Sequence, residues 1–303
     1  MIRTENLTKD YNGVKAVDGL NLEVEEGDIF GFLGPNGAGK STTMLMLVGM
    51  IEPTHGKCFV NDIEVSKDPL SVKNIVGYLP EDIGFYSNMT AEENLDYFAR
   101  FYKIEKSARK KKIEEVLELV NLGGVTKKAG QFSRGMNQRL GMAQALINDP
   151  KILFLDEPTA NLDPESVFQY RNLVKRLSDE GKTIFIVSHI LPEVSNVCKT
   201  IGIIKEGKLI AKGTLDELKK EFSGIGEDQK QMIIEAFDPI PDLTHSDILK
   251  IKYSEDRKRV VIESTSDIRE DISGILLEKH IRMKGMKMHE PTLEEAFLSI
   301  YKE

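Results

Sequence analysis

The chain has 303 residues, of which 40% are hydrophobic and 30% are charged, and its formal net charge is -8. This composition is typical of a soluble globular protein with one large and one small domain, or two medium ones. The negative charge argues against a surface that coats nucleic acid. No apolar run approaches the ~20 residues of a membrane-spanning helix, and the N-terminus lacks the pattern of a signal peptide.

The first two-thirds of the chain alternates short apolar runs with longer helical patterns. Three of these runs are continuously apolar, at residues 29–33, 152–155 and 184–187. Such runs are expected of parallel strands that are buried on both faces. A segment over 84–149 has helical periodicity, and one helical stretch within it opens with Thr90 and Glu93 at the spacing of a capping box. We therefore predict an α/β core that carries an inserted helical subdomain.

The pattern changes after residue 222. Residues 223–231 are polar and contain glycine, which is typical of a linker. Beyond it the pattern predicts, in order, two alternating strands joined at 255–258, an amphipathic helix over 267–280, a strand over 282–290 and a helix over 292–303. We therefore expect a large domain over 1–222 and a small α+β domain over 223–303 with a regulatory or assembly role.

A glycine-rich stretch, "GPNGAGKST", follows the first apolar run at residues 34–42. Glycines without a Cβ let backbone N–H groups close around phosphate oxygens. In this pattern Lys40 neutralises the β- and γ-phosphates and the Ser41 hydroxyl ligates Mg²⁺. An ordinary glycine-rich turn is the alternative, and the strand before it and the helix after it argue against that interpretation.

Polar side chains end the second and third apolar runs. Asp156 is placed to hold Mg²⁺, usually through water, and Glu157 can orient and polarise an attacking water. The alternative, surface acids on a turn, fits poorly with an acidic pair that follows four apolar residues. Ser188 and His189 end the third run, and we expect the histidine to face the γ-phosphate rather than solvent or core.

The stretch "FSRGMNQRL" over 132–140 places a small hydroxyl residue, an arginine and a glycine before a helical pattern. Ser133 can cap this helix, and the N–H groups at a helix start form an anion site. These residues alone leave open which anion binds there.

Together "GPNGAGKST", "FSRGMNQRL", "LFLDEPTANLDP" and "IVSH" resemble, in order and approximate spacing, the motifs of ABC transporter ATP-binding subunits, and the resemblance covers residues 1–222. It implies a P-loop NTPase cassette with a mixed-sheet core, with ATP and Mg²⁺ as ligands. Tyr11 would stack on adenine, residues 161–163 would form the dimer-contacting D-loop, and His189 would be the switch histidine. The phosphates would be held by Gly34, Pro35, Asn36, Gly37, Ala38, Gly39, Lys40, Ser41 and Thr42.

The resemblance also implies which groups act in hydrolysis and in assembly. Asp156 would be the magnesium acid and Glu157 the catalytic acid. Two subunits of this family pair head to tail, so that Ser133 and Gly135 would bind the γ-phosphate of the partner's ATP. The expected partners are a second copy of this chain and a separate multi-span permease, which would hold the chain on the cytoplasmic face of the cell membrane. No nucleic-acid partner is expected.

Two stretches depart from the usual family pattern. The usual signature is Leu-Ser-Gly-Gly-Gln, and Phe132, Arg134 and Met136 replace three of its five residues. Glu81 stands where the family usually has glutamine, and its carboxylate still offers an oxygen to Mg²⁺. Both variants, and the segment "PTLEEAF" near the C-terminus, resemble the drug-export (DrrA-like) branch and point to export.

Two other classes of protein share part of this pattern. Soluble ABC ATPases that act on nucleic acid or ribosomes usually carry coiled coils, zinc modules or two cassettes, whereas this chain has one cassette and two isolated cysteines. A P-loop kinase or GTPase is disfavoured because no guanine-reading Asn-Lys-x-Asp follows the cradle. We therefore expect an ATPase that dimerises on ATP and drives a permease, with a soluble ABC ATPase as the alternative.

Overall fold

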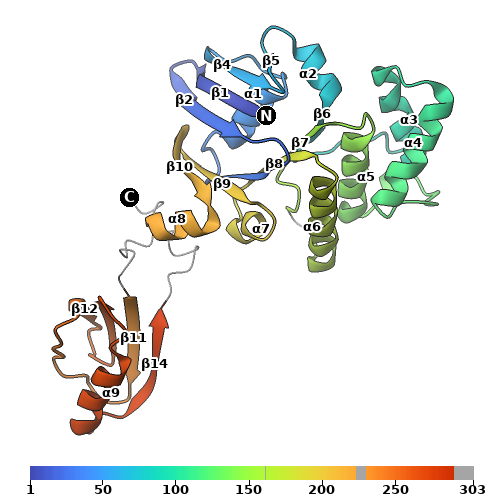
Figure 1. Cartoon of the computed structure of the whole chain (residues 1–303). Helices are drawn as coiled ribbons and strands as arrows, with labels where there is room; N and C mark the ends of the chain where they lie inside the picture. The colour runs from blue at the N-terminus through green and yellow to red at the C-terminus, as the bar shows by residue number, and fades with distance from the viewer. Residues whose placement is uncertain (161, 223–229, 290–303) are drawn as a thin grey trace. The chain divides into compact units, whose positions relative to one another are not determined.

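The structure is a computed structural model that describes residues 1–160, 162–222 and 230–289 (Figure 1). It divides into two compact units, Met1–Leu215 and Asp216–Glu303. The division falls seven residues before the expected boundary at residue 222, because most of helix α8 (Leu215–Phe222) groups with the second unit. The helix expected over 292–303 lies outside the described residues, as do residues 223–229 of the expected linker.

A six-stranded sheet forms the centre of the first unit, in the order β10-β9-β3-β8-β7-β6. Its strands are β3 (Ile29–Leu33), β6 (Val76–Leu79), β7 (Ile152–Asp156), β8 (Thr183–Ser188), β9 (Thr200–Lys205) and β10 (Lys208–Thr214). All pairs are parallel except β9 with β10. The predicted apolar runs are β3, β7 and β8, and every residue in these strands is buried. Because parallel strands share a direction, the residues that end them meet at one edge of the sheet.

A second, antiparallel sheet has the order β2-β1-β4-β5. It consists of β1 (Ile2–Tyr11), β2 (Val14–Val24), β4 (His55–Val60) and β5 (Ile63–Glu64). Helix α1 (Lys40–Leu47) contacts strands of both sheets, and its buried residues join one hydrophobic core with them. The apolar runs did not predict this sheet, because its strands are only partly buried and carry charged residues along their length.

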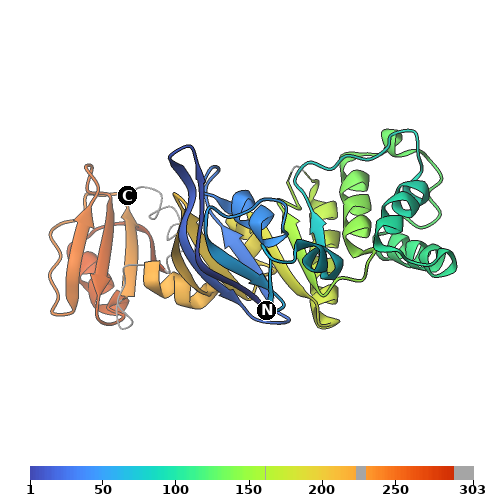
Figure 2. The ribbon, with the colours of Figure 1, turned by 90° about the horizontal axis from the view of Figure 1, so that it is seen from above.

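Some helices pack around the parallel sheet, and others form a separate group beside β6 (Figures 1 and 2). The remaining helices of this unit are α2 (Pro69–Ile75), α3 (Ala91–Ala99), η1 (Arg100–Tyr102), α4 (Lys106–Leu119), η2 (Ala129–Gln131), α5 (Arg134–Leu146), α6 (Pro164–Asp179) and α7 (Leu191–Ser195). The predicted capping box of α3 is confirmed, since Thr90 Oγ1 accepts from the Glu93 N–H and Glu93 Oε2 accepts from the Thr90 N–H. Within the described residues, no helix is both long and apolar enough to cross a membrane.

The second unit contains a four-stranded sheet in the order β12-β13-β11-β14. Its elements are β11 (Lys230–Ala236), β12 (Ile248–Tyr253), β13 (Arg259–Ser264), α9 (Arg269–Glu278) and β14 (Met283–His289). Ile234, Ile262 and Ile272 pack in a core of their own, fully buried. The assignment of residues 230–231 to a linker was wrong, because they begin β11, whose buried Met232 and Ile234 fix it in the sheet.

Candidate functional site

The glycine-rich loop over 34–42 joins the end of β3 to the start of α1. Gly37 and Gly39 have φ angles of 81° and 102°, which side chains other than glycine rarely allow. A Cβ on Gly39 would also lie 2.2 Å from the carbonyl oxygen of Ala16. No side chain caps α1 at its start, Lys40, so this end of the helix presents backbone N–H groups to a ligand.

Lys40 lies inside this loop with 6% of its surface exposed. Its Nζ donates hydrogen bonds to the carbonyl oxygens of Gly34 and Pro35, each at 2.9 Å. Burial lowers the pKa of the ammonium group, and the nearby Glu157 and Asp156 oppose that change. The loop carbonyl groups and the two carboxylates therefore favour a positively charged Lys40 in the glycine-rich loop.

Asp156 ends β7 and is 4% exposed. The hydroxyl of Ser41, in the first turn of α1, donates to Asp156 Oδ1 at 3.2 Å. Burial raises the pKa of Asp156 to about 6, and the charges of Glu157 and Glu81 act in the same direction. A carboxylate in this environment is stabilised by a cation that approaches it.

Glu157 follows Asp156 and is 6% exposed, with a φ angle of 44°. This left-handed conformation is uncommon for a residue with a side chain, and a hydrogen bond from the Glu157 N–H to the Val187 carbonyl, at 3.0 Å, supports it. Glu157 Oε1 lies 2.9 Å from His189 Nδ1, and Ser188 Oγ donates to Oε2 at 3.2 Å. The ends of β7 and β8 thus bring the predicted acid and histidine into contact.

A cavity of about 340 Å³ opens over these side chains. Its lining includes many of the residues that the sequence predicted for nucleotide and metal binding. They are Asn36, Gly37, Gly39, Lys40, Ser41, Thr42, Glu81, Glu157 and His189. The cavity and the contacts beneath it join the ends of β3, β7 and β8 into one polar site.

Two residues at this site were missed in the sequence. Ala16, in β2, lines the cavity, and no sequence pattern marks it. Glu193, in α7, places Oε2 3.2 Å from Ser188 Oγ. It follows His189 by four residues, a spacing that suits a return contact, but a glutamate in a short helix carries no signal that separates it from a solvated one.

Tyr11 does not line this cavity. It ends β1 with 49% of its surface exposed, and Lys9 Nζ lies 5.2 Å from the centre of its ring. The ring therefore stands outside the hydrophobic core.

Ser133 and Gly135 lie at the start of α5, also away from the cavity lining. Ser133 Oγ accepts a hydrogen bond from the Met136 N–H at 3.3 Å, as an N-cap does. Gly135 faces α6, because a Cβ on it would lie 3.1 Å from Ser166 Oγ. Ser133 and Arg134 are both exposed, so this helix start faces outward.

The stretch predicted as the D-loop, 161–163, is described in part, because Asn161 lies outside the described residues. Asp163 caps α6 and accepts a hydrogen bond from the Ser166 N–H at 2.9 Å. Asp163 therefore has a local role at the start of α6.

The oxygen donors near Ser41 and Asp156 suit a hard cation. Mg²⁺ prefers hydroxyl and carboxylate oxygens, keeps several waters and commonly binds substrate phosphates as well. Over the described ranges, no group of three or more His, Cys, Asp or Glu side chains lies close enough to hold a metal. The residues therefore fit a cation that is shared with a bound phosphate chain rather than a metal held by protein alone.

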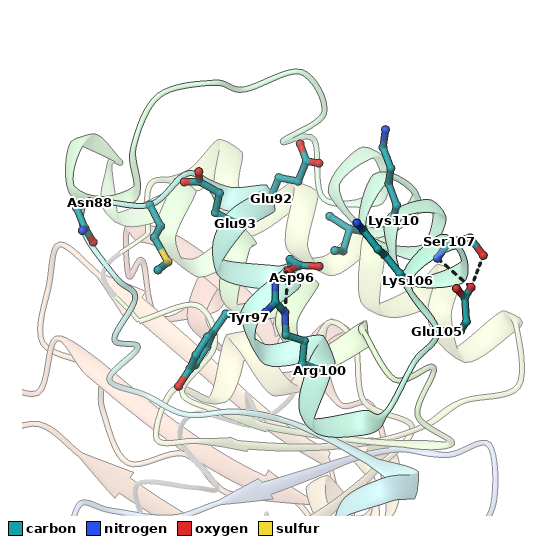
Figure 3. Close-up of a pocket in the computed structure, with 12 residues that line it drawn as sticks. Asn88, Glu92, Glu93, Asp96, Tyr97, Arg100, Glu105, Lys106, Ser107 and Lys110 are labelled. Atoms are coloured by element: carbon teal, nitrogen blue, oxygen red, sulfur yellow. Dashed lines mark hydrogen bonds and ion pairs between the residues drawn. The ribbon is translucent and has the colours of Figure 1, made fainter.

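A larger hollow of about 1130 Å³ lies in the helical subdomain and is distinct from the cradle (Figure 3). Glu92 and Asp96 reach it from α3, and Lys106 and Lys110 from α4. Asp96 is already paired with Arg100 inside the hollow. Its charges are mixed in sign, so the hollow does not present the concentrated positive charge that a nucleotide needs.

Comparison with known proteins places the chain among transport ATPases. Residues 17–160 match the family described as ABC transporter. The bacitracin transport ATP-binding protein BcrA of Bacillus licheniformis is 39% identical over 310 residues, which cover 99% of this chain and 97% of that protein. The linearmycin resistance ATP-binding protein LnrL of Bacillus subtilis is 34% identical over 312 residues, covering 99% and 98%.

Solved structures share the fold. The dimeric post-hydrolysis state of the ATP-binding cassette MJ0796, bound to ADP and Pi, superposes with a TM-score of 0.65 and 27% identity over 71% of this chain and 99% of that one. The ATP-binding subunit of an ABC transporter gives a TM-score of 0.67 and 26% identity over 75% and 96%. The predicted cassette fold is confirmed.

Proposed function

This chain belongs to the ABC transporter family as an ATP-binding, ATP-hydrolysing subunit, and from that premise we propose that two copies close around ATP to drive an export permease. The observation that carries the proposal is the convergence of five side chains on one site. They are Lys40, Ser41, Asp156, Glu157 and His189. Lys40 supplies a cation, and Ser41 and Asp156 supply oxygens for a metal ion. Glu157 supplies a water-polarising acid, and His189 contacts that acid.

The proposed chemistry follows from these positions. The N–H groups at the start of α1 and the Lys40 ammonium hold the β- and γ-phosphates. Ser41 and Asp156 would hold Mg²⁺, which, when bound, neutralises charge on those phosphates. Glu157 polarises the attacking water, and His189, 2.9 Å from its Oε1, lines the same cavity and would contact the γ-phosphate. The exposed ring of Tyr11 would stack on the adenine.

A second copy of the chain would complete the site. Ser133 and Gly135 lie at a helix start that faces outward, and they do not line the cavity of their own chain. Placed head to tail, this helix start would meet the γ-phosphate held by the partner's loop, where its N–H groups favour an anion. The solved MJ0796 cassette is dimeric, which supports pairing of this kind.

The permease would dock on the helical subdomain, next to the segment that carries Glu81. Tyr86, Tyr97 and Phe101 expose 44%, 38% and 68% of their surfaces. Their rings lie together, with centroids 5.1 Å apart for Tyr86 and Tyr97 and 5.5 Å apart for Tyr97 and Phe101. Exposed aromatic clusters favour protein partners. Such docking would keep the chain on the cytoplasmic face of the cell membrane.

The cargo is proposed from the relatives. BcrA is named for bacitracin transport and LnrL for linearmycin resistance, and both align over nearly the whole of this chain. We infer that this chain drives export of an antibiotic-type compound, which the permease would select.

The second unit is proposed as a regulatory or assembly module. Its core is separate, with Ile234, Ile262 and Ile272 fully buried in it. A chain that ends at residue 222 should therefore still bind ATP while losing dimer or permease association. A truncated chain that aggregates or no longer binds ATP would show that this unit is part of the cassette core.

The direct test of the proposal is Glu157→Gln, which keeps the size of the side chain and removes its negative charge. Hydrolysis should fall by about 100-fold or more, as when a general base is lost. ATP should then hold a dimer that gel filtration detects, and ADP should not. A variant that hydrolyses ATP at the parent rate would refute the role of Glu157, and an ATP-loaded variant that stays monomeric would refute closure around ATP.

A further inference from the structure

Both oxygens of the Glu157 carboxylate are held by consecutive residues at the end of β8. His189 Nδ1 lies 2.9 Å from Oε1, and Ser188 Oγ donates to Oε2 at 3.2 Å. The histidine is 43% exposed at its side chain, whereas Ser188 is completely buried. The outer contact is therefore accessible to a ligand, while the inner contact is shielded from solvent.

Ser188 is held in turn from α7. Glu193 Oε2 lies 3.2 Å from Ser188 Oγ, and the Ile190 N–H donates to the same oxygen at 3.0 Å. A short hydroxyl turn of this kind accounts for the bond from Ile190. It does not account for two carboxylates that converge on one buried hydroxyl.

The hydrogen count gives this convergence a consequence. A serine hydroxyl carries one proton and two lone pairs. Its proton can point to Glu157 or to Glu193, but not to both at once. A carboxylate at position 193 accepts this proton, so Glu193 competes with Glu157 for it, whereas a side chain at position 193 that makes no contact leaves the proton to Glu157.

We propose that Ser188 is a positioning residue that holds the carboxylate of Glu157 in the orientation needed to polarise water, and that Glu193 tunes this contact as a competing acceptor of the serine proton. The proposal rests on the proposed role of Glu157 as the water-polarising acid. Neither residue needs to touch ATP: Ser188 acts on Glu157 and Glu193 acts on Ser188. Glu157 has a left-handed backbone, φ 44°, and its side chain lines the cavity while Ser188 contacts one of its oxygens.

Steady-state ATP hydrolysis by the full chain tests this inference. Ser188→Ala removes the donor and should lower kcat about tenfold, the effect expected when a hydrogen bond to a charged group is lost, while KM for ATP stays within about twofold. Glu193→Ala should raise kcat, by at most about twofold, without a change in KM, because the serine proton is then left to Glu157. Glu193→Gln should not lower kcat either, because its amide can donate to Ser188 Oγ and leave the serine proton to Glu157.

Ser195→Ala, on the same helix, is the matched control and should behave as the parent. Melting temperatures of all variants within a few degrees of the parent (about 2–4 °C per kcal/mol for a chain of this size) would separate positioning from lost stability. The inference is overturned if Ser188→Ala keeps the parent kcat, or if Glu193→Ala lowers kcat. It is also overturned if Glu193→Gln lowers kcat, or if KM of Ser188→Ala rises as steeply as its kcat falls. Failure of the proposed function is read separately, from parent-like hydrolysis by Glu157→Gln.

Discussion

The phosphate loop and the start of α5 both place small residues at a helix N-terminus, but the surroundings of the two helix starts differ. Around Lys40 the ends of β3, β7 and β8 converge, and buried acids, a hydroxyl and a histidine share one cavity. At Ser133 the helix start faces outward, and its hydroxyl bonds to the first turn of its own helix. We propose from this contrast that one chain supplies one half of a site and that a second copy supplies the other half.

The largest expected effect comes from a substitution in the phosphate loop, the buried half of the site. Lys40→Ala removes the cation that the loop holds and should weaken ATP binding by about 2–3 kcal/mol, roughly 30- to 150-fold in Kd. Titration with a fluorescent ATP analogue measures this change. Lys73→Ala, at an exposed position on α2, is the matched control. If Lys40→Ala bound ATP as tightly as the parent, the loop would not be part of the ATP site.

A second prediction concerns the buried acid in the nucleotide-free chain. The pKa of Asp156 is raised from 3.8 to about 6, so between these values the folded state binds more protons than the unfolded state and stability falls as pH rises. Asp156→Asn does not titrate. From about pH 4 to pH 7 the free energy of unfolding of the variant should therefore gain about 2 kcal/mol on that of the parent.

Urea unfolding of both proteins across this range measures the difference. Mg²⁺ and ATP together should reduce it, because a cation favours the charged form of the parent's carboxylate. A difference that is the same at every pH would contradict the burial of a titrating Asp156.

The smallest expected effect is at Glu81, which lines the cavity. Glu81→Gln should keep ATP hydrolysis within about twofold of the parent, as an exposed substitution usually does. Glu81→Ala should lower transport in membranes more than it lowers basal hydrolysis, because we expect Glu81 to link the site to the permease. Equal loss of both activities would leave Glu81 with a catalytic or structural role alone.

The same contrast explains what could be predicted from the sequence. Strands β3, β7 and β8 were predicted because burial on both faces makes them continuously apolar, and the residues that end them follow directly. The antiparallel sheet was missed because partial burial leaves it without such runs. Ala16 and Glu193 join the site only through contacts distant in the sequence or through a short helix, so local patterns do not mark them.

The measurement that tests the composite site most directly is ATP-dependent dimer formation by mixed variants, followed by gel filtration in the Glu157→Gln background. Ser133→Arg places bulk and charge at the outward helix start, and Lys40→Ala disables the loop. Each variant alone should remain largely monomeric. In a head-to-tail pair of the two variants both defects fall in one site and the other site is whole, so the mixture should recover a dimer. A dimer formed by Ser133→Arg alone as readily as by the parent, or a mixture that stays monomeric, would contradict the account.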